Sequence, residues 1–295
     1  MADTDVDIDA LRAHRFPGGA RTIDHWENWL LTDCTRRGPM TEGLLHPVTL
    51  FHLPLAAAGT SVAELLALGG GGAPGSVTLL GYDWEYLGQL REGVEYSGSG
   101  GVAAAERVYG EGGEVAFDDV AFTIELHDPA GVCSARVTNR WRFRRSTAPH
   151  QPAAHIGHGE PLPPLVVADV GVDRMKTMAA LLRDPYPIHW DPAAVRAAGY
   201  GDRPVNQGPL NLGYVANMLM AWAGDGAIRR LTVAFHGRVF AGDTVVAAGT
   251  VDGVAGGAAH DVVEVEGEHR RHCSVWLDRG ADRLLSGTAE VAIPA

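Results

Sequence analysis

The sequence predicts an α+β protein made of two tandem copies of one unit, a helix followed by antiparallel strands. An apolar helix pattern over 209–223 precedes several strand candidates, and the first half repeats that order. A stretch rich in proline and small residues, 146–164, separates the two. We therefore expect an N-terminal domain at 1–148, a linker at 149–164 and a C-terminal domain at 165–295.

The second half contains three helix patterns. Val172–Leu182 places its apolar residues on one face and ends before Pro185, since a residue that precedes proline leaves the helical region. Asp191 before Pro192 is typical of a helix start. The 209–223 pattern is apolar almost all round and predicts a buried helix. Its large apolar residues read as core rather than as a cofactor site: Tyr214, Met218 and Trp222.

The rest of the second half is rich in strand patterns, with a turn at Asp278-Arg279-Gly280. We expect strands at Arg230–Val239, Val245–Val254, Cys273–Leu277 and Leu284–Ile293, whereas 256–270 fits either a strand or a loop.

In the first half, Ser61–Leu68 reads as a helix, Gly69–Gly72 as a flexible loop and Asp128–Gly131 as a hairpin turn. Strands are expected at Ser76–Leu80, Val94–Tyr109, Glu114–Leu126 and Val132–Arg145.

The most informative stretch is Asp184-Pro185-Tyr186-Pro187-Ile188-His189-Trp190-Asp191. A carboxylate and an imidazole five residues apart are able to hold and activate one water molecule. Downstream, Asn206-Gln207-Gly208-Pro209-Leu210 opens the buried helix, where backbone N–H groups are able to polarise a carbonyl. Taken singly, Asp184 also fits a turn residue or helix cap, and His189 a surface histidine.

The order of these pieces resembles the motif of MaoC-like and R-specific enoyl-CoA hydratases, D-x-N-P-x-H-x-D. The run from Arg238 to Val245 and the ending Leu285–Val291 are similar to later strands of that family, so the resemblance covers about residues 165–295. It implies a double hotdog fold, a catalytic dyad of Asp184 and His189, and an oxyanion site at the Gly208 N–H. It also implies substrate-binding positions at Tyr186, Pro187, Asn206, Gln207, Pro209 and Leu210.

The sequence departs from the family at two of these positions. Tyr186 stands where the family has Asn, and Gln207 where it often has His. Residues 20–145 resemble the N-terminal dehydratase-like domain of double-hotdog hydratases, without a catalytic motif. Their histidines, His25, His46 and His52, are expected to be structural or to line a tunnel for an acyl chain.

The resemblance implies a hydro-lyase that acts reversibly on an enoyl thioester of CoA or of acyl carrier protein, with no metal or organic cofactor. Two alternatives remain. Hotdog folds also host thioesterases, because a fold does not fix a function. The second alternative is a non-catalytic acyl-thioester-binding partner. A homodimer is a further expected assembly.

Composition narrows the partners and the compartment. The net charge of -12 argues against nucleic acid as a partner. The sequence contains no run of eighteen apolar residues, so no membrane span is predicted. Cys34, Cys133 and Cys273 are odd in number and widely spaced, which favours a cytoplasmic protein. Three histidines of the expected linker read as solvated rather than as metal ligands: His150, His155 and His158.

Overall fold

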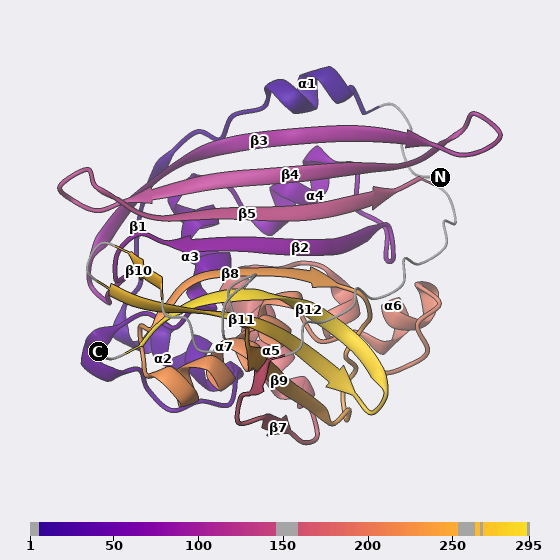
Figure 1. Cartoon of the computed structure of the whole chain (residues 1–295). Coiled ribbons are helices and arrows are strands. Elements are labelled where there is room, and N and C mark those ends of the chain that lie inside the picture. The colour runs from indigo at the N-terminus through magenta and orange to yellow at the C-terminus, as the bar shows by residue number, and fades with distance from the viewer. Residues whose placement is uncertain (1–5, 146–158, 253–262, 266–267, 294–295) are drawn as a thin grey trace.

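The computed structural model describes residues 6–145, 159–252, 263–265 and 268–293. Its core is one continuous 12-stranded sheet, to which both halves of the chain contribute. Figure 1 shows strands β2 to β5 of the N-terminal half above the sheet strands of the C-terminal half, with β2 and β8 side by side where they meet. The α+β double-hotdog prediction is confirmed by this arrangement and by the structural relatives described below.

The N-terminal half supplies the first five strands and most of the short helices. Its elements are α1 Ile8–Ala13, β1 Gly19–Thr22, α2 His25–Cys34, the 3-10 turn η1 Thr41–Gly43, α3 Thr49–Ala57, α4 Val62–Leu68, β2 Val77–Tyr86, β3 Glu95–Tyr109, β4 Val115–His127 and β5 Cys133–Arg144. The strands follow one another across the sheet in the order β1-β3-β4-β5-β2.

The C-terminal half continues the sheet and contributes its longest helix. Its elements are β6 Glu160–Pro161, β7 Leu165–Val167, α5 Val172–Leu182, the 3-10 turn η2 Pro187–His189, α6 Pro192–Ala197, α7 Gly208–Ala223, β8 Ile228–Phe235, β9 Val245–Val251, β10 Val263–Val265, β11 Glu268–Arg279 and β12 Asp282–Ala292. The strand order here is β8-β12-β11-β9-β6, and β7 also pairs with β9.

The two halves are joined by an antiparallel ladder between β2 and β8, which runs from Gly81 opposite Ala234 to Glu85 opposite Arg230. Gly81 is needed for this approach, because a Cβ there would lie 2.2 Å from the Val233 carbonyl oxygen. Asp83 opposite Thr232 is the central pair. A local two-fold relation through that pair makes the two ends of the ladder equivalent, and each end pairs a residue of one half with a residue of the other.

The long helix α7 is the centre of the C-terminal core. Twelve of its residues are buried, and it packs against strands β7, β8, β9, β11 and β12. This confirms the expected buried helix and the core role of Tyr214 and Met218, each about 1% exposed. α5 begins and ends where the sequence predicts, and Asp191 caps α6 by accepting from the Ala193 N–H at 2.8 Å.

The first half differs from the prediction in its principal helix. The sequence suggested Ser61–Leu68, which is α4 with its Ser61 cap. The helix that packs against β1, β3 and β4 is α3, and nearly all of its residues are buried. Pro54 lies inside α3 and interrupts the sequence pattern, since proline lacks the N–H that a helix interior uses. Among the described residues no single helix is long and apolar enough to cross a membrane, though the bent pair α3–α4 reaches that length and composition.

Several boundaries also differ. β2 continues six residues beyond the expected Leu80, and β11 begins at Glu268 instead of Cys273. The end of the expected linker joins the sheet, because Glu160 and Pro161 pair with β9. The linker's three histidines and most of its length lie outside the described residues, so the domain division proposed above stays a prediction.

Candidate active site

A cavity of about 160 Å³ opens at one end of the β2–β8 ladder, between the two halves. Both halves contribute to its wall. Apolar and aromatic side chains come from both halves, and those of the N-terminal half include Phe51, Leu66, Leu79, Tyr82 and Trp141. Most polar side chains come from the C-terminal half, including Asp184, His189, Asn206, Gln207 and Arg238.

The chain folds so that Asp184 and His189 face each other in this cavity. α5 ends in a left-handed Arg183 with φ 49°, and the Asp184 N–H bonds back to the Ala179 carbonyl at 2.9 Å. The turn η2 then carries His189 to a point where its Nε2 lies 3.6 Å from Asp184 Oδ2. Both side chains are largely buried, with 12% of His189 and 8% of Asp184 exposed.

Hydrogen bonds fix the orientation of both side chains. Asp184 Oδ1 accepts from the Tyr186 N–H at 2.9 Å, which leaves Oδ2 toward the imidazole. His189 Nδ1 lies 2.7 Å from the Val205 carbonyl oxygen. A carbonyl only accepts, so Nδ1 carries a proton, and in the neutral tautomer it is Nε2 that presents a lone pair toward Asp184. The Val205 N–H bonds in turn to the Ile188 carbonyl at 2.9 Å.

The separation of 3.6 Å between Nε2 and Oδ2 exceeds an ordinary hydrogen bond. Two acceptors at this distance suit a water or hydroxyl group that donates to one or both. The pair therefore has the geometry of a candidate general acid–base site, since such hydrogen bonds are often long in the absence of a ligand.

The first turn of α7 supplies the second element of the site. Gln207 is the N-cap residue, and its side chain makes no capping hydrogen bond, so the first N–H groups of the helix are open to a ligand. Gly208 begins the helix beside the cavity. A Cβ on Gly208 would lie 2.2 Å from Leu79 Cδ2 and 3.3 Å from the Tyr82 hydroxyl, so β2 of the other half covers this helix end.

Unpaired polar atoms gather at this cavity. Six buried side-chain atoms of the described residues have no hydrogen-bond partner, and four of them belong to residues of the cavity wall. These four are Tyr82 OH, Trp141 Nε1, Asn206 Oδ1 and Gln207 Oε1. Buried polar groups are nearly always paired in proteins, so this concentration indicates a place where a polar ligand completes the network.

The six expected substrate-binding residues divide into two groups. Tyr186, Asn206, Gln207 and Pro209 line the cavity. Pro187 and Leu210 are not part of the cavity wall; Pro187 begins η2, and Leu210 is fully buried inside α7.

Tyr186, which replaces the family's Asn, has a structural contact that the sequence did not suggest. Its hydroxyl accepts from the Gly75 N–H at 2.7 Å and donates to the Ala73 carbonyl at 3.3 Å. Both partners belong to the loop that precedes β2. Tyr186 thus ties the turn that holds the Asp184–His189 pair to the N-terminal half.

The three histidines singled out in the N-terminal half, His25, His46 and His52, lie outside the cavity wall, and each has a hydrogen-bond partner. His46 is fully buried, and its Nε2 bonds to Asn217 Oδ1 of α7 at 2.8 Å. His52 bonds to the buried Glu27 at 2.9 Å, and His25 to Glu92 at 2.9 Å. The expected structural role fits these contacts, whereas a tunnel-lining role does not.

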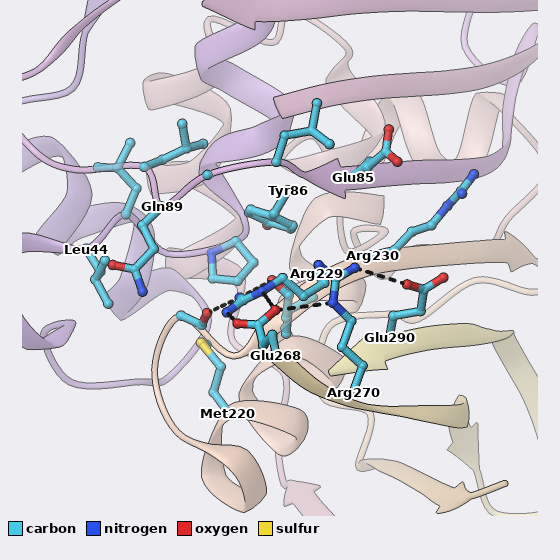
Figure 2. Close-up of a pocket in the computed structure, with 17 residues that line it drawn as sticks. Leu44, Glu85, Tyr86, Gln89, Met220, Arg229, Arg230, Glu268, Arg270 and Glu290 are labelled. Carbon is cyan, nitrogen blue, oxygen red and sulfur yellow. Dashed lines mark hydrogen bonds and ion pairs between the residues drawn. The ribbon is translucent and has the colours of Figure 1, made fainter. Parts of the chain in front are cut away.

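A second cavity, of about 450 Å³, occupies the equivalent end of the β2–β8 ladder (Figure 2). The two-fold relation makes Tyr86 of this cavity equivalent to Phe235 of the first cavity, and Ile228 equivalent to Leu79. Its polar wall consists of ion pairs, with Glu268 bound by Arg229 and Arg270. No histidine is among the residues that line it. Of these two cavities, as far as the described residues line them, the first alone combines an Asp–His pair with a helix start.

The segment from Arg238 to Val245 is a tight structural turn. Asp243 accepts from the Phe240 N–H at 2.9 Å and pairs with Arg203 and Arg279. Burial would raise the pKa of Asp243, but the bonds from Arg279, from the Phe240 N–H and from Arg203 hold that pKa below its ordinary value. Arg238 itself lies over the Tyr200 ring, 3.8 Å from its centroid, and lines the cavity.

One family model matches part of the chain. Residues 159–272 match the family model described as the MaoC like domain. No curated protein matches the chain significantly. One similar solved structure is a MaoC-like dehydratase from Phytophthora capsici, with a TM-score of 0.71, 15% identity, and coverage of 98% of this chain and 100% of that one.

Two further structures agree. A MaoC-like dehydratase superimposes with a TM-score of 0.70 and 14% identity over 97% of this chain and 99% of the other. A Mycobacterium tuberculosis protein described as a double hotdog fold gives 0.64 and 11% identity, with 95% of each chain covered. At such identities these likenesses show the fold alone.

Proposed function

Since the C-terminal half of this chain carries the domain of the MaoC-like dehydratase family within a double-hotdog fold, we propose that the protein adds water reversibly to an enoyl thioester. The product is a 3-hydroxyacyl thioester, and dehydration is the reverse. The observation that carries the proposal is the facing pair of His189 Nε2 and Asp184 Oδ2, 3.6 Å apart in a cavity beside the start of α7.

In the hydration direction the pair binds the attacking water. The Nε2 lone pair of His189 accepts a hydrogen bond from one O–H of this water, and Asp184 Oδ2 accepts a hydrogen bond from the other. As the water oxygen bonds to the β-carbon, the imidazole takes up a proton. That proton is then delivered from the pair to the α-carbon on the same face, so one water O–H bond and the C=C π bond break while a C–O bond and a C–H bond form.

The start of α7 stabilises the charge that develops on the thioester oxygen during this addition. The Gly208 N–H points from a helix N-terminus, where the partial positive charge of the helix adds to the hydrogen bond. No capping side chain competes for the open N–H groups of this turn.

The cavity wall suggests how the rest of a substrate lies. Phe51, Leu66 and Trp141 give the N-terminal side an apolar surface that suits an acyl chain. Arg238 suits the anionic carrier, either CoA or acyl carrier protein. Its guanidinium donates to the Tyr200 hydroxyl at 2.9 Å, and within the described chain it forms no ion pair with a carboxylate.

The decisive assay supplies trans-2-enoyl-CoA substrates of different length and branching to the intact chain. Loss of enoyl absorbance without release of free thiol supports a hydratase. Thiol release from saturated acyl-CoA instead indicates a thioesterase. Tight binding with neither change identifies a non-catalytic acyl-thioester partner, and both of these results contradict the proposal.

A further inference from the structure

Tyr82 of β2 is a tightly packed polar side chain of the candidate active-site cavity. It is fully buried, and three aromatic rings hold it: Trp84 stacks on it at 4.9 Å, Phe235 meets it edge-on at 5.4 Å and Phe51 is tilted against it at 5.7 Å. Its ring therefore has little freedom to turn its hydroxyl toward another partner.

That hydroxyl ends beside the start of α7. It lies 3.3 Å from the point that a Cβ on Gly208 would occupy, and it has no hydrogen-bond partner. Burial, together with the charge of Asp184, raises the pKa of Tyr82 well above its ordinary value, so the group stays a protonated donor.

A buried donor without a partner destabilises a protein, and phenylalanine would fill the same aromatic niche without that cost. The hydroxyl is thus best explained by a partner that arrives with the ligand. The Gly208 N and this Cβ position are attached to the same Cα, so a thioester oxygen that accepts the Gly208 N–H lies near the Tyr82 hydroxyl as well.

We propose that Tyr82 is a catalytic residue supplied by the N-terminal half, and that its hydroxyl donates, with the Gly208 N–H, to the thioester oxygen of the substrate. This inference rests on the proposed function and extends it, since the half without a motif then contributes to the chemistry. Preorganised donors of this kind act on the charge that develops in the transition state.

Tyr86 provides a matched control on the same strand. Its hydroxyl is also buried and unpaired, but its ring lies in the second cavity, as Figure 2 shows. Tyr82→Phe and Tyr86→Phe each remove one buried, unpartnered hydroxyl from β2. Any effect on the strand itself is therefore shared, and an effect on the thioester belongs to Tyr82 alone.

The first test is kinetic, on the best enoyl-CoA found for the wild type. Tyr82→Phe should lower kcat about 100-fold with a small change in KM, as loss of one oxyanion donor does, whereas Tyr86→Phe should keep wild-type kcat. Equal kcat values for wild type and Tyr82→Phe, with both folded, would overturn the inference and leave the proposed function standing.

The second test needs no turnover. Hexanoyl-CoA labelled with ¹³C at its carbonyl lacks the double bond that hydration requires, and difference infrared spectroscopy reports hydrogen bonding to its carbonyl. The bound carbonyl stretch should lie at lower frequency in wild type and Tyr86→Phe than in Tyr82→Phe. Identical bound spectra for wild type and Tyr82→Phe would refute the role of Tyr82, whether or not any enoyl-CoA is hydrated. A lack of hydration would instead count against the proposed function.

Discussion

Leu79 of β2 packs directly on Gly208 of α7, so that a methyl group on Gly208 would lie 2.2 Å from Leu79 Cδ2. The two residues come from different halves of the chain and meet at the start of the helix. Glycine at 208 thus lets the N-terminal half cover the helix end without displacing it.

We expect Gly208→Ala to lower turnover about 10- to 100-fold, because the methyl group must push Leu79 aside at the proposed thioester site. Leu79→Ala removes the obstructing side chain. The double variant should therefore recover part of the lost kcat, and a double-mutant cycle measures the coupling. If the changes in activation free energy of the two single variants simply add in the double variant, the two residues act separately.

The Asp184–His189 pair gives the most direct prediction. Asp184→Asn and His189→Ala should each lower kcat by about 10²- to 10⁴-fold, the usual contribution of a positioned acid or base. Circular dichroism should show a native fold for both. A folded variant with near wild-type turnover would remove its residue from the mechanism.

His46 should make the junction between the halves sensitive to acid. Burial lowers its pKa to about 4 from 6.5, although the bond to Asn217 opposes this shift. The unfolded chain therefore binds the proton first, and stability is lost as pH falls from about 6.5 toward 4. The full loss is about 3 kcal/mol, at 1.36 kcal/mol per pKa unit.

Urea unfolding at pH 7 and pH 4 measures this loss. His46→Asn has no titrating ring, so its stability should change less between the two pH values than that of the wild type. His25→Asn is the control, because the His25 side chain is 74% exposed. An equal pH dependence in wild type and His46→Asn would show that other groups control acid sensitivity.

Tyr186→Phe should loosen the contact between the motif turn and the N-terminal half. It leaves the Gly75 N–H and the Ala73 carbonyl without the hydroxyl that now pairs with them. We expect a loss of about 1–2 kcal/mol of stability, by thermal or urea unfolding. KM should rise more than kcat falls, since the hydroxyl is occupied by the loop. A kcat loss as large as that of the dyad variants would assign the hydroxyl to the chemistry instead.

Residues 160–295 expressed alone should be insoluble, inactive or self-paired. This fragment exposes the edge of β8 that now pairs with β2, and an unpaired edge recruits other strands. Light scattering and the enoyl-CoA assay distinguish these states from the alternative. A soluble, monomeric and active fragment would contradict the dependence of the site on the N-terminal half.

Much of the C-terminal half could be predicted from its sequence because its signals are local. The helix Val172–Leu182, the Asp191 cap and the apolar helix at 209–223 each depend on near neighbours in the chain. The contact of Asp184 with His189 could also be predicted from the sequence, since only a short turn separates the two residues.

What the sequence did not reveal depends on contacts between the halves. Tyr82 and Leu79 lie more than 100 positions before Gly208, and only the β2–β8 register brings them to it. The alternation of Tyr82, Trp84 and Tyr86 was a sign that β2 continues beyond Leu80. The neighbouring residues in the sequence did not indicate that Tyr82 lines the candidate active-site cavity whereas Tyr86 lines the second cavity.

The placement of the active-site cavity across the β2–β8 ladder has a thermodynamic consequence. A ligand that fills it contacts both halves, so its binding free energy opposes the unfolding of the whole chain rather than of one domain. At 100 times its Kd such a ligand should stabilise the protein by about 2.7 kcal/mol. The melting temperature of the intact chain thus becomes a measure of acyl-thioester affinity, available even for a compound that is bound and never converted.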